Sequence, residues 1–174
     1  MDWPTAGAPS QQVITPVSAC ALGTELVALG APAPASATVA VNLVYFIPFV
    51  IQDSLLLDYW FMWTGTSPSG SALVGVYSQD GVLLHSTSIA SVSSGTIHNQ
   101  GTGDFQLSRG LFWLAFATVS ASLTSTAISL SAPALELAGV RTTTLATSLA
   151  ATYPIPGLTC SATIVPLFGF RGKA

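Results

Sequence analysis

Apolar residues in this chain occur in short runs that are separated by turns rich in Gly, Pro, Ser and Asp. Two of the runs, residues 39–47 and 55–63, are about nine residues long and rich in β-branched, aromatic and large aliphatic side chains. Apolarity alone would also suit a buried helix, but the short length and the bounding Pro48 and residues 65–70 favour strands. A third apolar run, residues 111–119, predicts a central strand in the same way.

The clearest local signal is a β-hairpin. Residues 73–79 and 82–87 predict two strands on either side of Asp80 and Gly81. This dipeptide accepts the positive φ values of a type I′ turn, the turn whose twist matches that of two antiparallel strands. We therefore expect the two strands to be neighbours in one sheet.

Weaker signals extend over the rest of the chain. Residues 123–130 alternate with the two-residue period of a strand, and residues 88–104 predict one irregular strand with a loop. Residues 133–139 predict one helical turn that Gly139 closes. Residues 158–168 predict a last strand that ends at the edge of a sheet.

Eight to ten short strands at a spacing of roughly ten residues predict an all-β fold, an antiparallel β-sandwich of jelly-roll type. We assign this domain to residues 38–174. Residues 1–37 are rich in Ala, Pro and Gly without periodicity, and they predict an extended N-terminal arm with an Ala/Pro linker, or else an unstructured terminus. The apolar residues of an arm need a cover, which we expect a neighbouring subunit to supply: Val13, Ile14, Val17, Leu26 and Leu29.

Charged residues are scarce in this sequence. The chain has seven acidic and four basic residues among 174, where a typical domain of this length has about 44 charged residues. Four scattered basic residues cannot neutralise a row of phosphates, which excludes nucleic acid as a partner. A near-neutral surface of hydroxyls and methyls tends to associate, so we expect a homo-oligomer whose surface is covered by sister copies or by another partner.

The mean hydropathy of +0.63 is high enough to raise the question of a membrane. The longest apolar run, residues 39–51, is interrupted by Asn42 and Pro48 and is shorter than the roughly 20 residues of a spanning helix. We therefore expect no membrane partner, and we expect no secretory signal. Two cysteines, Cys20 and Cys160, are too few for a disulfide scaffold.

Few side chains are candidates for catalysis, because the chain has seven carboxylates and two histidines. Asp58 stands out, since it interrupts the most apolar strand and an unpaired buried carboxylate is costly. We expect it to face solvent or a subunit, or to pair with Arg109 or Arg141; an enzyme would need it as acid or base. Neither His85 nor His98 has a second ligand at metal spacing. The sequence therefore predicts no enzyme, no cofactor and no metal site.

Most aromatic side chains are expected in the core between two sheets. Trp63 is different, because it lies beside the Gly/Ser/Pro loop that follows its strand. We identify it as a candidate platform on which a sugar ring could stack, with Tyr77 as an amphipathic partner. This gives a second hypothesis, a glycan-binding module that recognises a receptor.

Three motifs follow one another in a distinctive order: YFIPF at residues 45–49, GVYSQDG at residues 75–81 and LSRGLFWLA at residues 107–115. Over residues 40–120 this order resembles the small β-sandwich domains of virion proteins in tailed bacteriophages. Those domains occur at the tips of tail fibres or as outer head proteins. Residues 153–156 are similar to a proline turn before the last strand of such domains.

The resemblance implies a non-enzymatic structural protein on the exterior of a virion, made in the host cytoplasm. It also implies a homotrimer that contacts other virion proteins, such as the major capsid protein or tail proteins. The chain departs from a long fibre because it has no repetitive shaft. This favours a capsid decoration (cement) protein or a short fibre-tip protein, with the arm as its tether.

Overall fold

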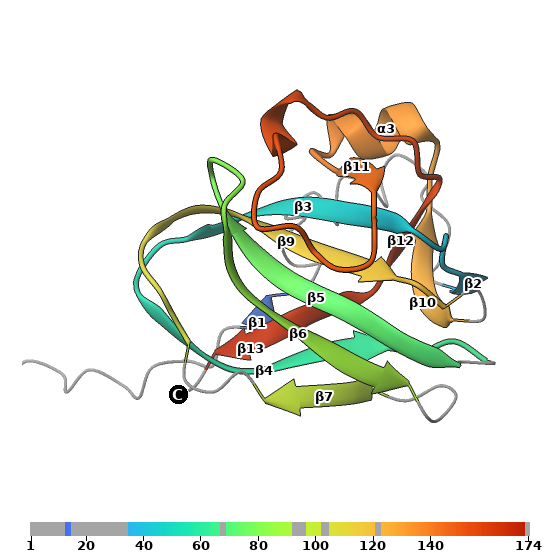
Figure 1. The fold of residues 1–174 in the computed structure, drawn as a ribbon, viewed down its shortest axis with the longest axis horizontal. Coiled ribbons are helices and arrows are strands. Elements are labelled where there is room, and N and C mark those ends of the chain that lie inside the picture. The colour runs from blue at the N-terminus through green and yellow to red at the C-terminus, as the bar shows by residue number, and fades with distance from the viewer. Residues whose placement is uncertain are drawn as a thin grey trace, which may run out of the picture.

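The computed structural model describes residues 13–14, 35–66, 69–91, 97–101, 105–120 and 123–172. Over these residues the chain is nearly all β, and its antiparallel sheets pack together as a sandwich (Figure 1). This confirms the predicted all-β sandwich, whereas the jelly-roll connectivity in particular stays a prediction.

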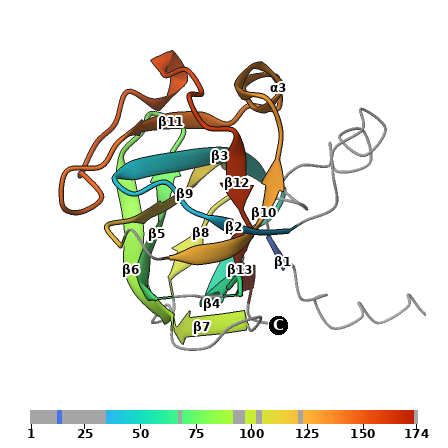
Figure 2. The same ribbon diagram turned by 90° about the vertical axis from the view of Figure 1, so that its right-hand side faces the viewer.

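Three antiparallel sheets make up the fold. The first sheet has the strand order β11 (Arg141–Thr144), β3 (Leu43–Ile51), β9 (Gly110–Thr118), β5 (Gly70–Ser78) and β6 (Leu83–Ser91). The second sheet has the order β1 (Val13–Ile14), β13 (Phe168–Gly172), β4 (Leu55–Trp63) and β7 (Ile97–Gly101), and β8 (Gln106–Leu107) also pairs with β4. The third sheet has the order β12 (Ile164–Pro166), β10 (Thr124–Ser129) and β2 (Ala35–Thr38), and lies at one side of the molecule (Figure 2). The described residues also form two short helices, α3 (Ala132–Leu137) and η1 (Ile155–Gly157).

The main core lies between the first and second sheets and is rich in aromatic rings. Trp60 on β4, Phe116 on β9 and Phe168 on β13 are all fully buried. The rings of Phe116 and Phe168 are 4.8 Å apart between centroids, and those of Trp60 and Phe170 are 5.5 Å apart. Burial of such large apolar side chains is the main favourable term that holds the two sheets together.

A second core covers the opposite face of the first sheet. Phe46 and Tyr77 are fully buried there, against Leu149 and Ile155 from the chain between β11 and β12. Figure 1 shows this orange segment, which includes η1, passing over the first sheet. The segment explains why the central strands β3 and β9 are apolar on both faces, since each face of the first sheet has its own cover.

The predicted hairpin is present as β5 and β6, but the prediction of a type I′ turn is wrong. That turn needs a positive φ at both Asp80 and Gly81, and of the two only Gly81 has one, at 80°. Gly81 N–H donates to Ser78 O at 3.0 Å, and Ser78 N–H donates to Val82 O at 2.8 Å. This is the pattern of a three-residue loop, in which a type I turn is followed by a left-handed glycine.

Strand β3 begins and ends later than the predicted run of residues 39–47, and it continues through Pro48. Strand β11 pairs with β3 only from Leu43 to Phe46, so Pro48 has a described neighbouring strand, β9, on one side only. A residue without an N–H is tolerated at such a position. Asn42, with a φ of 58°, forms the turn before β3.

The helical turn predicted at residues 133–139 is α3, and Gly139 closes it as expected. Gly139 has a φ of 86° and donates its N–H to Glu136 O, while Val140 N–H donates to Leu135 O. These two bonds form a Schellman motif, which needs a residue in the left-handed region. An ideal Cβ on Gly139 would also lie 2.8 Å from Pro48 Cγ, so glycine allows α3 to approach β3.

The predicted last strand, residues 158–168, is only partly a strand: residues 158–163 belong to no strand, residues 164–166 form β12, and Phe168 begins β13 in a different sheet. Strand β12 pairs with β10 at the edge of the third sheet, as expected, whereas β13 lies between β1 and β4 in the second. Leu167 lies between them, where its N–H donates to Thr126 O and its carbonyl accepts from Trp63 N–H. At the other end, β2 brings Ala35 into the third sheet, so the sandwich includes the last three residues of the predicted arm.

Candidate functional site

One piece of the predicted arm has a described position. Val13 and Ile14 form β1, which pairs antiparallel with β13 at Arg171 and Phe170. The arm therefore adds a short strand to the edge of the second sheet, here the sheet of its own chain. The other predicted assembly residues, Val17, Leu26 and Leu29, lie outside the described residues.

The outer face of β4 carries a row of partly exposed side chains next to this edge. Leu57 and Trp60 are both buried, so the strict alternation of the strand shifts by one residue between them. The shift coincides with an irregularity in the pairing with β13, where Arg171 lies opposite Tyr59 and Gly172 opposite Leu57. Asp58 is the extra residue of this bulge, so Asp58 and Tyr59 both point away from the core.

Trp63 is at the end of this row and is the exposed aromatic side chain that the sequence singled out. It is 45% exposed. Its backbone is held on two sides, because Trp63 N–H donates to Leu167 O at 2.9 Å and Ser125 Oγ donates to Trp63 O at 2.8 Å. An indole on a strand held in this way can present one face to a ligand at a small entropic cost.

Tyr77 cannot belong to the same platform, which corrects the sequence-based pairing of Tyr77 with Trp63. Tyr77 is fully buried in the second core, on the far side of the first sheet. Its hydroxyl donates to Ala150 O at 2.8 Å, and burial raises its pKa well above the ordinary value. The register shift between Val76 and Tyr77 marks a bulge in the β5–β6 pairing, which the sequence pattern did not reveal.

Asp58 faces outward, which is one of the two placements expected from the sequence, but its partner is neither Arg109 nor Arg141. The Asp58 carboxylate accepts a hydrogen bond from Arg171 Nη2, and the Arg171 guanidinium also lies 4.3 Å from the centroid of the Tyr59 ring. Arg141 instead donates from Nη1 to two carbonyls, that of Glu136 in the last turn of α3 and that of Val140 just after the helix. The carboxylate is about one third exposed, so the ion pair, which the pairing of β4 with β13 brings together, adds little to stability.

Other reactive groups are held in packed surroundings. Burial raises the pKa of the Cys160 thiol, which keeps it protonated and a weak nucleophile at neutral pH. The His85 ring packs between Trp60 and Phe105, at centroid distances of 6.1 and 4.8 Å. Among the residues that the structure describes, His, Cys, Asp and Glu side chains form no group of three or more that could hold a metal ion.

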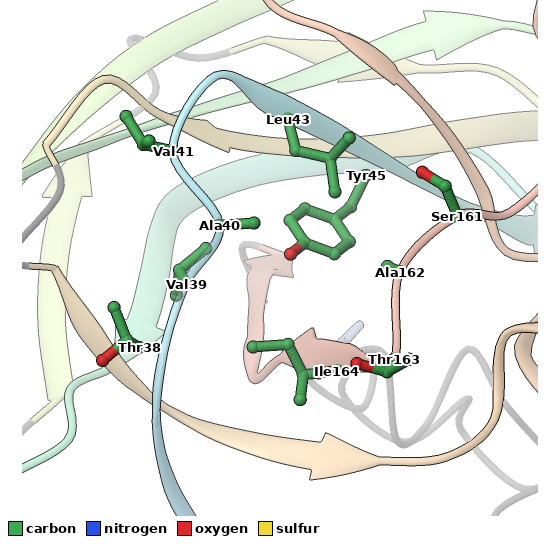
Figure 3. A pocket seen from close by; sticks show the side chains of 10 residues that line it. All are labelled: Thr38, Val39, Ala40, Val41, Leu43, Tyr45, Ser161, Ala162, Thr163 and Ile164. Atoms are coloured by element: carbon green, nitrogen blue, oxygen red, sulfur yellow. The ribbon is translucent and has the colours of Figure 1, made fainter.

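Sequence reasoning missed a pocket of about 430 Å³ at the third sheet (Figure 3). It opens between the β2–β3 connection and the segment that leads into β12. The hydroxyl of Tyr45 is buried at its floor, and its O–H group has no acceptor among the described residues. No sequence pattern could have revealed the pocket, because its two walls come from segments about 120 residues apart. The lining residues are Thr38, Val39, Ala40, Val41, Leu43, Tyr45, Ser161, Ala162, Thr163 and Ile164.

A comparison with models of known protein families finds no match, and neither does a comparison with curated proteins. Within the described part of the chain, no helix is both long and apolar enough to cross a membrane.

Proposed function

We propose that the protein is a non-enzymatic structural component on the exterior of a tailed-phage virion, a capsid decoration (cement) protein or a short fibre-tip protein. It acts as a homotrimer and binds the major capsid protein or a tail protein. The motif order at residues 45–115 supports the virion assignment through its resemblance to other virion sandwiches. The scarcity of charge supports self-association, because few ionic side chains oppose contact between copies.

The observation that carries the proposal is β1, the short strand that the arm adds to β13. Strand addition at a sheet edge is a common way to dock an extended segment, since backbone hydrogen bonds supply affinity whatever the side chains are. Twenty residues separate Ile14 from Ala35, where β2 begins. A segment of this length spans up to about 66 Å when fully extended, which is enough to reach a neighbouring copy. In the proposed trimer this pairing is exchanged between copies, so that β1 of one copy pairs with β13 of the next in place of its own β13.

Exposed apolar side chains on the described surface give a second line of support. Leu137 on α3 is 89% exposed, Val50 on β3 is 59% exposed and Val119 after β9 is 52% exposed. Single exposed apolar residues are ordinary, but here few charges surround them. Contact with sister copies or a capsid surface would remove them from water.

The virion assignment is tested on particles of the phage that encodes the chain. We expect the protein to remain with particles through a density gradient and to be accessible to antibody on intact particles. A copy number close to that of the major capsid protein means capsid decoration, and a much smaller number means a fibre tip. A host cytoplasmic protein, measured in the same fractions, is the control for host protein that contaminates the particles. Absence of the chain from purified particles contradicts the proposal.

A second candidate function is recognition of a host glycan, and the exposure of Trp63 favours it. Tyr59 and Phe61 lie along the same strand at two-residue intervals, so they extend the aromatic row on the outer face of β4. Arg171 above Tyr59 adds a hydrogen-bond donor beside the rings. Aromatic faces with adjacent donors are suited to the apolar faces and hydroxyls of sugars.

For this candidate we expect Trp63→Ala to weaken binding to any glycan on an array by at least about tenfold, because the stacking surface is lost. Stability changes little, since the side chain is partly exposed. Val50→Ala is the matched control, an exposed apolar residue on the first sheet, and keeps full binding. Unchanged glycan binding by Trp63→Ala rules out this platform.

A further inference from the structure

The pocket at the third sheet, defined above by its ten lining residues, has an apolar floor and a hydroxylated rim. Val39, Tyr45 and Ala162 are buried at its base. Thr38, Ser161 and Thr163 are exposed around its mouth. Its volume of about 430 Å³ falls within the range of small-molecule sites.

The buried hydroxyl of Tyr45 is the feature that identifies this pocket as a candidate ligand-binding site. Tyr45 is fully buried; the backbone N–H of Ala40 lies near its oxygen, but its O–H group has no acceptor among the described residues. Leaving a buried donor unpaired lowers stability, so a ligand that accepts its hydrogen bond recovers this cost. The other fully buried tyrosine, Tyr77, has its partner in Ala150 O at 2.8 Å.

The protonation state of Tyr45 decides which atom it can bind. Burial raises the pKa of Tyr45 to about 12, with a smaller opposing effect from the nearby backbone of Ala40. The hydroxyl is therefore protonated at every physiological pH and can donate a hydrogen bond. Figure 3 shows it in the space between Ala40 and Ala162, which lie on opposite walls of the pocket. Because Ala40 N–H already lies near the oxygen, the O–H donor is what lacks a partner, and a ligand atom that pairs with it is an acceptor.

The lining also determines the charge and shape of a ligand. None of the ten lining residues is charged, so a carboxylate or an ammonium group would lose its hydration without gaining a counter-ion. The hydroxyl is buried below an exposed rim, so the acceptor has to be carried at the end of a slim group. A backbone carbonyl lying along the rim would not reach the floor, which favours a small molecule over a docked peptide.

We propose that this pocket binds an uncharged, mainly aliphatic small molecule whose leading end carries a carbonyl or hydroxyl oxygen. That oxygen accepts a hydrogen bond from Tyr45, and the aliphatic part contacts Val39, Leu43 and Ile164. The site is separate from the outer face of β4 and from the β1 edge, so it does not depend on the proposed virion function.

The test is an NMR titration of the full chain with pentanamide, pentanoate and pentylammonium, which each have five carbon atoms and differ in the charge of the head group and in whether it has an acceptor oxygen. We expect saturable binding of pentanamide, with shifts confined to the pocket residues, and no saturable binding of the two ions. Tyr45→Phe keeps the ring and removes the donor, and weakens pentanamide binding about three- to tenfold. Ala40→Leu fills the mouth from an exposed position and abolishes binding.

Tyr77→Phe is the control for removing a buried tyrosine hydroxyl elsewhere in the sandwich, and it leaves pentanamide affinity unchanged. Three results overturn the proposal: no saturable binding of pentanamide, equal affinity of Tyr45→Phe, or equal binding of pentanoate. If Tyr45→Phe fails to fold, Ala40→Leu decides the question alone, because binding that survives it places the ligand outside the pocket.

Discussion

We expect Gly81→Ala to lower the free energy of unfolding by about 2 to 4 kcal/mol. Gly81 has a φ of 80°, where an L side chain is strained by about 1 kcal/mol or more. An ideal Cβ at this position would lie 1.9 Å from Tyr153 O and 3.1 Å from the carbonyl carbon. Backbone, unlike a flexible side chain, cannot give way without moving its whole segment.

The segment that has to move is part of the cover of the first sheet. Tyr153 N–H donates to Gly81 O, and Leu83 N–H donates to Ala151 O, both at 2.9 Å. The Tyr153 ring lies 5.1 Å from Phe46 and 5.7 Å from Tyr77 between centroids. A displacement large enough to accept the new methyl group breaks these hydrogen bonds and loosens the second core.

Guanidinium unfolding followed by tryptophan fluorescence measures the effect. Gly157→Ala is the matched control, because an ideal Cβ on Gly157 has nothing within 4 Å and no positive φ has to be kept. We expect it to change the free energy of unfolding by less than about 1 kcal/mol. Equal effects of the two substitutions would mean that the contact between the hairpin loop and residues 151–155 is absent in solution.

The sequence predicted strands best where apolar composition and turns agree. Strand β4 spans the predicted residues 55–63, because the run is bounded by turns on both sides and buried by its neighbours. The predicted strand at residues 39–47 ends four residues before β3 does, because Pro48 is expected from the sequence to end it. Whether proline ends a strand depends on which side of the strand has a partner, and that is a property of the sheet order.

Side-chain orientation was harder to predict than strand position, because bulges change it. In β4 the bulge at Asp58 shifts the alternation, so that Asp58 and Tyr59 both face outward. A bulge leaves no mark in the spacing of apolar residues when both faces of the strand are apolar, which is why the outward position of Asp58 required the structure. Tyr77 keeps the regular alternation of β5, because the extra residue of the β5–β6 irregularity is Leu84, and it is buried because the chain between β11 and β12 covers its face of the sheet.

Contacts between distant segments could not be derived from spacing. Asp58 and Arg171 are 113 residues apart and meet because β13 pairs with β4. The cover of the first sheet comes from residues 145–158, which have no period of a helix or strand. The Tyr45 pocket likewise forms between two connections, and these are the parts of a chain whose path local propensity determines least.

Removing the N-terminal arm is expected to have a large effect on assembly. We expect the full chain to sediment as a trimer and a chain that begins at Ala35 to sediment as a monomer. The truncation removes β1 and keeps β2, which the third sheet needs for its pairing with β10. Without β1, the exposed edge of β13 has lost the backbone hydrogen bonds that we propose to join one copy to the next.

A point substitution distinguishes the loss of β1 pairing from the loss of the N-terminal residues themselves. Ile14→Pro removes one backbone N–H within β1 and is expected to dissociate the trimer as the truncation does, since proline disrupts a two-residue strand. Ser10→Pro, which adds a proline outside β1, keeps the trimer. Sedimentation velocity over a series of concentrations measures all four chains. A full chain that is monomeric at every concentration contradicts self-association. A trimer that survives truncation means that the interface does not use β1 and is formed by other surfaces, such as the exposed apolar residues Leu137 and Val50.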